Sequence, residues 1–462
     1  MSKTYITNLE SVVALAKRRG FVFPGSEIYG GLKGTWDYGP LGVVLVNNLK
    51  REWWKFFVEG REDMYGLDAA ILMNARVWEA SGHTGAGFCD PLVEDTKTGE
   101  RYRADHLLKD QGIDAEGMTL NDIDVAIKTH NIKSPNGNPL SEARQFNMMF
   151  ETRIGATVGN EGKVYLRPET AQGIFANFKN VVDTMNPKIP FGIAQIGKAF
   201  RNEIAPREWL FRVREFEQFE IEYFIKEEEW ETLFDYWRKQ IHAWNDHIGL
   251  RPESVREYEV PKEDLAHYSK RTIDFEYDFP GKGFDELLGF AYRTDHDLKN
   301  HMEHSGVSQE YIEPDGSRFV PHVLEPSFGL GRMVTAVLCE AYTEDEMNGE
   351  KRTFLRLPKH LAPYRVAVSP LLKNKPQLVE KAREVFGTLK REFGNVAYDD
   401  NGNIGKRYRR QDEIGTPYCV VIDFDTLGEE SSSEHKDTVT VRDRDTGAQE
   451  RVVIGELVEY LG

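Results

Sequence analysis

Apolar residues recur with a period near 3.6 along several stretches of the chain, which predicts amphipathic helices. These stretches are Leu9–Arg19, Leu41–Val58, Glu227–Ile248, Met333–Tyr342 and Gln377–Phe393. Gly20 follows the first stretch directly, as glycine often does at the end of a helix. Trp54 lies off the apolar stripe of the second helix and hints at a second buried face. Either a dimer interface or ordinary core packing would account for that face.

Short apolar runs bounded by turn residues predict strands. They are Leu67–Met73, Ile273–Tyr277, Glu286–Tyr292, Val320–Leu324, Tyr364–Val368, Tyr418–Ile422, Val439–Arg442 and Arg451–Ile454. The pattern weakens between about residues 90 and 150, which we interpret as an insertion. A boundary is expected near residues 356–363. We therefore expect one domain over 1–355, which contains the insertion, and a second over 356–462.

The stretch from Lys198 to Phe224 predicts two strands joined by a short loop, the second strand beginning near Phe211. One face of that second strand would carry two cations, an aromatic ring, an amide and a carboxylate, namely Arg212, Arg214, Phe216, Gln218 and Glu220. Arginine binds phosphate through a planar fork of donors, an aromatic ring stacks on a base, and a carboxylate holds an amine. The alternative is a surface hairpin with ion pairs of little individual weight.

Composition narrows the class of protein. The chain has 462 residues, 40% of them hydrophobic, and a net charge of −17, which argues against non-specific coating of nucleic acid. Its three cysteines, Cys89, Cys339 and Cys419, form no CxxC pair, so a disulfide framework or a cysteine zinc site is not expected. The polar N-terminus shows no signal-peptide pattern, and we expect a cytoplasmic protein.

Other segments carry weaker chemical signals. Gly329-Leu330-Gly331-Arg332 opens a helix, where backbone N–H groups favour anions. A basic run with an embedded tyrosine, residues 405–411, would suit phosphates and a stacked base, or be simple solvated charge. His296 and His301 lie among aspartates but match no metal spacing, so satisfied structural histidines are the favoured interpretation.

Several motifs found in this order resemble those of the class II aminoacyl-tRNA synthetases, most closely the homodimeric, glycine-specific type. They are WDYGPLG, WEASGH, YLRPETAQGIF, FRNE with FRVREFEQFEIEYF, and EPSFGLGR. The resemblance covers nearly the whole chain. It implies an α+β fold, with an antiparallel sheet flanked by helices and a C-terminal mixed α/β anticodon-binding domain. It also implies a ligase that joins glycine to tRNA(Gly) through an adenylate, using ATP and Mg²⁺.

The same resemblance assigns roles in ATP binding. Arg201 would bind the α-phosphate, Glu203 the adenine amino group, Arg212 the γ-phosphate, and Phe216 and Arg332 the two faces of adenine. Arg201, Glu203 and Arg332 are the expected catalytic residues. The full ATP set is Arg201, Asn202, Glu203, Phe211, Arg212, Val213, Arg214, Glu215, Phe216, Glu286, Leu287, Gly329, Leu330, Gly331 and Arg332.

The resemblance also implies an acidic glycine pocket that selects by excluding every larger amino acid. Its set is Arg103, Glu169, Phe216, Glu217, Gln218, Phe219, Glu220, Glu325, Pro326, Ser327, Phe328 and Gly329, with Arg167 and Arg293 close to the substrate. Glu325 is a candidate Mg²⁺ ligand. The loop with Arg207 and Trp209 would meet the tRNA acceptor end.

Two positions depart from the family. Ala75 stands where the first class II motif often has proline, so the resemblance does not predict the detail of the strand that forms the dimer in the family. Residues 95–100 lack the cysteines that bind zinc in some relatives, so no zinc is expected. A threonyl type would need zinc ligands that are missing here, and a histidyl type would need its own signature. A synthetase-like accessory protein without catalysis would have decayed ATP residues, whereas Arg201, Glu203, Phe216 and Arg332 are all present.

Overall fold

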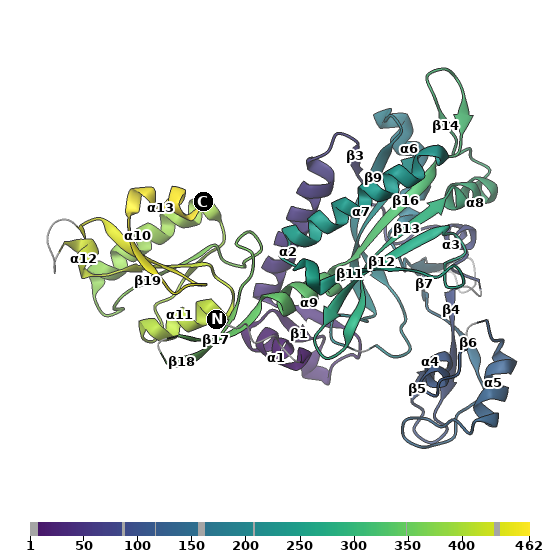
Figure 1. Ribbon diagram of the computed structural model, residues 1–462, viewed down its shortest axis with the longest axis horizontal. Coiled ribbons are helices and arrows are strands. Elements are labelled where there is room, and N and C mark those ends of the chain that lie inside the picture. The colour runs from purple at the N-terminus through teal and green to yellow at the C-terminus, as the bar shows by residue number, and fades with distance from the viewer. Residues whose placement is uncertain are drawn as a thin grey trace.

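The computed structural model describes residues 8–85, 88–115, 117–155, 162–206, 208–347, 349–428 and 435–462. Arg207, expected near the tRNA acceptor end, lies outside these residues. Figure 1 shows a large central body, a C-terminal module (residues 366–462) to one side, and a small insertion lobe below. Mixed helices and sheets with an antiparallel central sheet confirm the predicted α+β fold.

The central body is built on one sheet of seven described strands, in the order β11-β12-β13-β16-β10-β9-β3. All neighbours are antiparallel except β3 and β9. The strands are β3 (Met64–Gly66), β9 (Phe191–Phe200), β10 (Glu215–Ile225), β11 (Val255–Glu259), β12 (Arg271–Phe279), β13 (Gly283–Thr294) and β16 (His322–Gly329). A further short pair, β1 (Val22–Pro24) and β2 (Trp36–Tyr38), precedes them.

Helices cover this sheet. They are α1 (Leu9–Arg19), α2 (Pro40–Trp54), α3 (Ala75–Ala80), α6 (Ala171–Met185), α7 (Trp230–His247), α8 (His296–Ser305) and α9 (Leu330–Ala341). The prediction for the first helix is confirmed, because it ends at Gly20 in the left-handed region with φ of 73°. Large apolar side chains of α2, α7 and α9 join those of the central strands in one core; they include Trp53, Trp237 and Met333.

Two expectations concern the helix α2 and its packing. The helix continues into a π-helical turn, Lys55–Glu59, as far as the predicted stretch reached. A side chain on Gly66 would collide with the Trp54 ring, so β3 of the same chain packs against part of that second face. The predicted strand Leu67–Met73 is wrong: after Gly66 the chain leaves the sheet edge, and only Leu72 forms an isolated bridge with Leu166.

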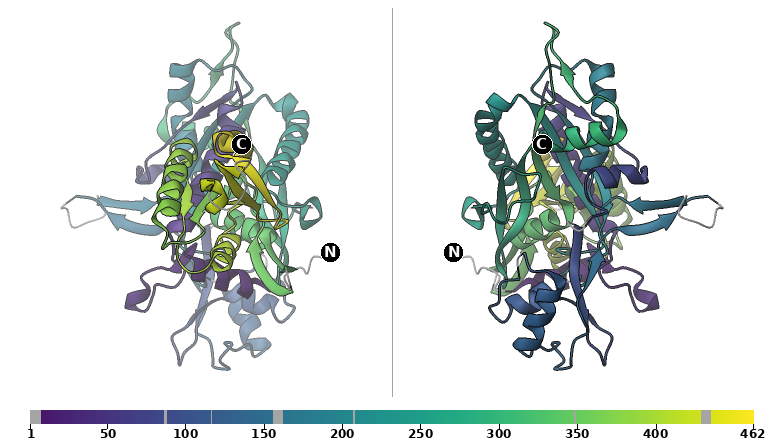
Figure 2. Two further views of the ribbon diagram at one scale, coloured as in Figure 1. Left: turned by 90° about the vertical axis from the view of Figure 1, so that its left-hand side faces the viewer. Right: turned by 90° about the vertical axis from the view of Figure 1, so that its right-hand side faces the viewer.

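The insertion folds around its own small core. Its elements are β4 (Cys89–Glu94), β5 (Arg101–Arg103), α4 (Ala104–Lys109), α5 (Leu120–Thr129) and β6 (Arg144–Asn147). Val93, Leu108 and Ile123 lie at its centre. A hairpin of β7 (Phe150–Arg153) and β8 (Lys163–Leu166) follows and projects sideways from the body (Figure 2).

A two-stranded hairpin, β17 (Tyr342–Met347) and β18 (Glu350–Leu355), precedes the C-terminal module. The module has a second core and a five-stranded sheet of described residues, ordered β20-β19-β21-β22-β23. Its strands are β19 (Val366–Pro370), β20 (Val396–Tyr398), β21 (Tyr418–Ile422), β22 (Thr438–Asp443) and β23 (Gln449–Val453). Its helices are α10 (Pro376–Phe393), α11 (Ile404–Glu413), α12 (Phe424–Leu427) and α13 (Leu457–Leu461). The short strand β20 is not among the strands predicted from the sequence.

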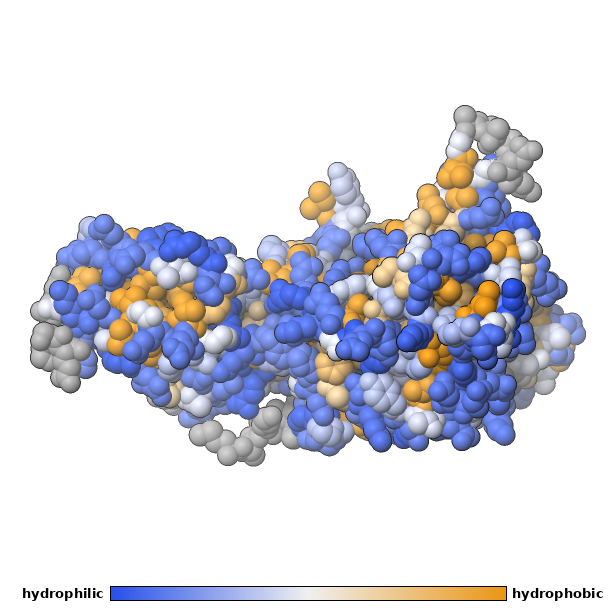
Figure 3. Space-filling view, turned by 90° about the horizontal axis from the view of Figure 1, so that it is seen from above, coloured by the Kyte–Doolittle hydropathy of each residue, from blue (hydrophilic) through white to orange (hydrophobic). Residues whose placement is uncertain are grey.

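The face seen in Figure 3 is largely hydrophilic, with separate small groups of apolar side chains over both the central body and the C-terminal module. A bilayer-spanning helix needs about 20 mostly apolar residues. Within the described ranges, every helix falls short of the length and apolarity required.

Candidate active site

A cavity of about 520 Å³ opens on the face of the central sheet. Its floor comes from β10, β13 and β16, and its walls from the start of α9, the loop between β9 and β10, and Arg103 of the insertion. The strand register explains which floor residues meet. Glu220 pairs with Ser327, and Ser327 pairs with Gly289, so one carboxylate and two small residues lie side by side. The cavity therefore has an acidic floor with two small residues beside the carboxylate.

Glu220 is held at this floor by four neighbouring groups. The Thr170 hydroxyl and backbone N–H both donate to it, the N–H at 3.1 Å, and the Ser327 hydroxyl donates at 2.9 Å. The Gln218 amide lies 3.4 Å away. Burial raises the pKa of Glu220, and the nearby charge of Glu169 raises it further. The carboxylate is therefore positioned to accept hydrogen bonds from a cationic ligand, which would favour its charged form.

Two further carboxylates flank Glu220. Glu325 lies 2.7 Å from the guanidinium of Arg293, yet burial raises the pKa of Glu325 to about 8. Glu169 lies 3.3 Å from His83. Burial by itself would raise the pKa of Glu169, but His83 and Arg293 outweigh it and lower this pKa. Neighbouring carboxylates thus have pKa values pushed in opposite directions, as is common at ligand sites.

The other end of the cavity is cationic and aromatic. The Arg201 guanidinium lies 5.4 Å from the centre of the Phe216 ring, and the Arg332 guanidinium lies 4.4 Å from that of Phe211. Arg332 also pairs with Glu286 at 2.8 Å, and this pairing is the main cause of the lowered pKa of Glu286. Cations beside flat apolar rings suit a phosphorylated aromatic base.

The predicted alternation of the polar face holds only from Phe216 onward. The strand β10 begins at Glu215, so Arg212 and Arg214 lie in a loop, not in a strand. Arg212 still lines the cavity. Arg214 turns away and donates to the backbone carbonyls of Lys33 and Glu203, at 2.5 and 3.0 Å. Its guanidinium therefore stabilises the loop and is not part of the cavity lining.

Most of the residues predicted from the sequence line this one cavity. They are Arg103, Glu169, Arg201, Glu203, Phe211, Arg212, Val213, Phe216, Glu217, Gln218, Glu220, Glu286, Leu287, Arg293, Glu325, Ser327, Gly329, Gly331 and Arg332. The others lie outside its lining: Asn202, Arg214, Glu215, Phe219, Pro326, Phe328, Leu330 and Arg167.

The residues outside the lining have identifiable structural contacts. Phe219 and Phe328 are buried in the main core with Leu330. Glu215 pairs with Lys198. Arg167 donates to the carbonyls of Lys198 and Ala69, at 2.6 and 2.7 Å, beneath the sheet floor. The remaining two adjoin the lining: the Asn202 N–H bonds to the Met148 carbonyl at 2.8 Å, and Pro326 pairs with Phe290 between β16 and β13.

Tyr268, Asp274 and His83 are among the residues of the site that carry no prediction from the sequence. Tyr268 lies under the Arg293 guanidinium, 3.8 Å from it. It comes from the irregular segment before β12, where no periodic pattern points to a site. Asp274 lines the cavity, and burial together with Glu286 raises its pKa to about 7. His83 lies within the quoted motif WEASGH, which offered a signal for the contact with Glu169.

The basic run at 405–411 forms most of α11 and is only partly available to a ligand. Arg407 is buried and donates to the carbonyls of Pro370, Asp400 and Gly402. Arg410 pairs with Asp399 at 2.8 Å. The idea that the whole run is free to bind nucleic acid is therefore wrong for these two side chains, because they hold neighbouring loops.

The fold and the cavity agree with the comparisons to known proteins. Residues 156–341 match the family model described as "tRNA synthetase class II core domain (G, H, P, S and T)", and residues 365–462 match "Anticodon binding domain". The chain is thus an aminoacyl-tRNA synthetase of class II, a ligase with an anticodon-binding domain.

Full-length relatives narrow this class to one family. The chain is 50% identical to the glycine–tRNA ligase of Caldanaerobacter subterraneus subsp. tengcongensis, over 98% of this chain and 97% of that protein. It is 50% identical to that of Geobacillus kaustophilus and 49% identical to that of Bacillus anthracis, over 98% of both chains in each case. The chain belongs to the glycine–tRNA ligase family.

Proposed function

We propose that this chain activates glycine with ATP, giving glycyl-adenylate and pyrophosphate, and then transfers glycine to the 3′-terminal adenosine of tRNA(Gly). The observation that carries the proposal is one cavity with two chemically different ends. A cationic, aromatic end suits ATP, and an acidic end suits an ammonium-bearing substrate. The class II core and the glycine–tRNA ligase relatives support the same assignment.

ATP would lie between Phe216 and Arg332, with Arg201 on the α-phosphate, Arg212 on the γ-phosphate and Glu203 on the adenine amino group. All five side chains line the cavity, which supports these roles. The glycine carboxylate would attack the α-phosphorus and displace pyrophosphate. Arg201 would stabilise the charge that develops on the α-phosphate oxygens, a contribution that requires a fixed position more than proton transfer.

Glycine would place its ammonium group against Glu220, with Ser327 beside it and Glu169 adding negative potential. A larger amino acid would have to fit its side chain over a floor where Glu220, Ser327 and Gly289 are already in register. Close packing makes such an overlap costly. Exclusion of this kind avoids the weak discrimination, about 1–3 kcal/mol per methylene, of a pocket that must recognise a larger side chain.

Mg²⁺ would neutralise phosphate charge when ATP is bound. We propose Glu286 as its ligand, with Asp274 nearby, because both carboxylates line the cavity close to Arg332. The sequence-based candidate Glu325 fits less well, because it lies at the acidic end of the cavity and not at the cationic end where the phosphates are proposed to bind. Oxygen ligands of this type are those that Mg²⁺ prefers.

Residues 1–355 would form the catalytic domain and residues 356–462 the anticodon-binding domain, which holds the tRNA while its acceptor end reaches the cavity. Arg207 is proposed to meet that acceptor end. The expectation is wrong for Trp209, because its side chain is buried in the main core. We also propose a homodimer that acts in the cytoplasm, where translation takes place. Light scattering of the purified protein tests the dimer, and a monomer mass would reject it.

Pyrophosphate exchange across a panel of amino acids tests the central proposal. Exchange should depend on glycine and fall by more than a hundredfold with alanine or serine. Equal exchange with alanine would reject selection by exclusion. A lack of exchange with every amino acid would reject the activation step itself.

A further inference from the structure

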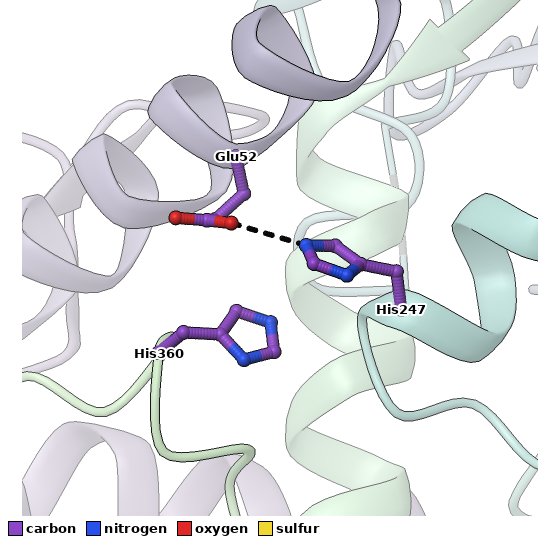
Figure 4. A group of neighbouring side chains, drawn as sticks. All are labelled: Glu52, His247 and His360. Atoms are coloured by element: carbon purple, nitrogen blue, oxygen red, sulfur yellow. Dashed lines mark hydrogen bonds and ion pairs between the residues drawn. The ribbon is translucent and has the colours of Figure 1, made fainter. Parts of the chain in front are cut away.

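Three side chains from distant parts of the chain meet where the central body adjoins the segment leading to the C-terminal module. Glu52 lies on α2, His247 is the last residue of α7, and His360 lies in the turn between β18 and β19. One ligand-type atom of each lies within 4.8 Å of the others. Figure 4 shows the carboxylate and the two rings gathered around one small space.

The contact between Glu52 and His247 already has the spacing of two metal ligands. His247 Nε2 lies 3.1 Å from Glu52 Oε2. Zinc bonds of about 2.0–2.1 Å in tetrahedral geometry place neighbouring ligand atoms about 3.3 Å apart. A metal ion could therefore replace the hydrogen-bonding proton of this pair with little movement of either side chain.

His360 supplies a nitrogen that lacks a partner. Its Nε2 atom is buried, and no group among the described residues forms a hydrogen bond with it. The ring lies 4.6 Å from that of His247, centre to centre. Buried polar atoms without a hydrogen-bond partner are rare in native proteins, so this nitrogen is a candidate to bind a ligand.

The surroundings hold the three side chains in place. Asn48, one helical turn before Glu52, is buried and donates to the carbonyls of Leu361 and Ala362, at 3.2 and 3.0 Å. This contact fastens the turn that carries His360 to α2. The rings of Phe56 and Trp244 lie 5.7 and 5.8 Å from that of His247. Ligands positioned by their neighbours lose less entropy on binding.

We propose that Glu52, His247 and His360 bind one divalent metal ion of the zinc class, with water as the fourth ligand. Two imidazoles and a carboxylate suit zinc better than magnesium, which prefers oxygen ligands. The ion would tie the start of the C-terminal segment to α2 and α7 and restrain the C-terminal module relative to the cavity. The expectation of no zinc arose from residues 95–100 of the insertion, which lie in a different part of the fold.

The test is a titration of metal-depleted, full-length protein with Zn²⁺ in competition with a chromophoric chelator. The variants are His360→Asn, Glu52→Gln and, as a matched control, His242→Asn. His242 lies on the same helix and pairs with a carboxylate, Glu257, at 2.8 Å, but belongs to no three-ligand group among the described residues.

Wild type and His242→Asn should bind one Zn²⁺ per chain. His360→Asn and Glu52→Gln should bind it more than about 100-fold more weakly, since even changes outside the ligand set cost 10–100-fold. Zn²⁺ should also raise the unfolding midpoint of wild type but not of Glu52→Gln. Absence of stoichiometric binding in wild type would leave only the hydrogen-bonded pair of Glu52 and His247 and overturn the proposal. Equal affinity in wild type and His360→Asn would overturn it as well.

Discussion

The guanidinium of Arg293 lies 2.7 Å from the carboxylate of Glu325, and both side chains are buried at the acidic end of the cavity. The same guanidinium forms two hydrogen bonds of 2.8 Å with Asp297 on α8. One cation thus compensates two buried carboxylates, and through them it links β13, β16 and α8 behind the floor of the cavity.

Replacing this cation should destabilise the protein and abolish glycine activation. In Arg293→Gln, Glu325 and Asp297 stay buried without their partner, and such losses cost about 3–5 kcal/mol. Denaturant unfolding at pH 7 measures the stability change. The control is Arg271→Gln on β12, whose pairing with Glu259 is partly exposed and should contribute about 1 kcal/mol or less. Equal losses in the two variants would contradict the structural role of Arg293.

Arg201→Ala should lower glycine-dependent pyrophosphate exchange by more than about 100-fold, because loss of one fixed donor at developing charge typically costs 10²–10³ in rate. The unfolding midpoint should change little, because the half-buried Arg201 side chain forms, among the described residues, one hydrogen bond of 3.1 Å to the Pro168 carbonyl besides its ring contacts. Lys198→Ala, at an exposed position of β9 three residues before Arg201, should keep full exchange. Near-normal exchange in Arg201→Ala would reject its assignment to the α-phosphate.

Asp274 should make stability depend on pH. Its folded pKa of about 7 lies above the ordinary 3.8 because of burial and the charge of Glu286. Well below pH 3.8 the carboxyl group is neutral in both the folded and the unfolded state and does not change the free energy of unfolding. Between pH 3.8 and about 7 the carboxyl group is ionised in the unfolded state but still protonated in the folded state. The free energy of unfolding therefore falls as the pH rises through this range.

Asp274→Asn removes this dependence. Its unfolding midpoint should match wild type near pH 4 and exceed it at pH 8, as thermal unfolding at the two pH values would measure. Asp278→Asn, an exposed position of the same strand, serves as the control and should show the same small difference at both pH values. A midpoint gain for Asp274→Asn at pH 4 but not at pH 8 would reverse the predicted sign.

The basic run of α11 should separate into structural and tRNA-binding positions. Arg407→Ala leaves buried carbonyls unpaired and should destabilise the C-terminal module by about 1–3 kcal/mol. Lys406→Ala, at an exposed position, should leave unfolding unchanged and lower tRNA charging several-fold, because a charge contact with phosphate is lost. Pyrophosphate exchange should stay normal in Lys406→Ala. A fall in exchange equal to the fall in charging would contradict the separate roles of the two domains.

Periodicity predicts the helices well because burial of one face imposes its spacing on the sequence. The helix Leu9–Arg19 has the predicted bounds, and so does the buried strand Tyr418–Ile422. The alternation on β10 likewise predicts that Phe216, Gln218 and Glu220 share a face, and all three line the cavity. The same pattern fails at Arg214, because alternation assumes a strand and the chain there is a loop.

The sequence by itself determined the order of the elements, the motifs of the family and most of the residues around the cavity. Only the tertiary structure decided which charged side chains are free for a ligand. Arg167, Arg214 and Arg407 look like binding residues in the sequence, but each donates to backbone carbonyls. Tyr268 under Arg293 and the cluster of Glu52, His247 and His360 likewise follow from packing. The physical reason is that such contacts join segments far apart in the chain, and no local spacing of residues encodes which backbone carbonyl or ring will lie within reach.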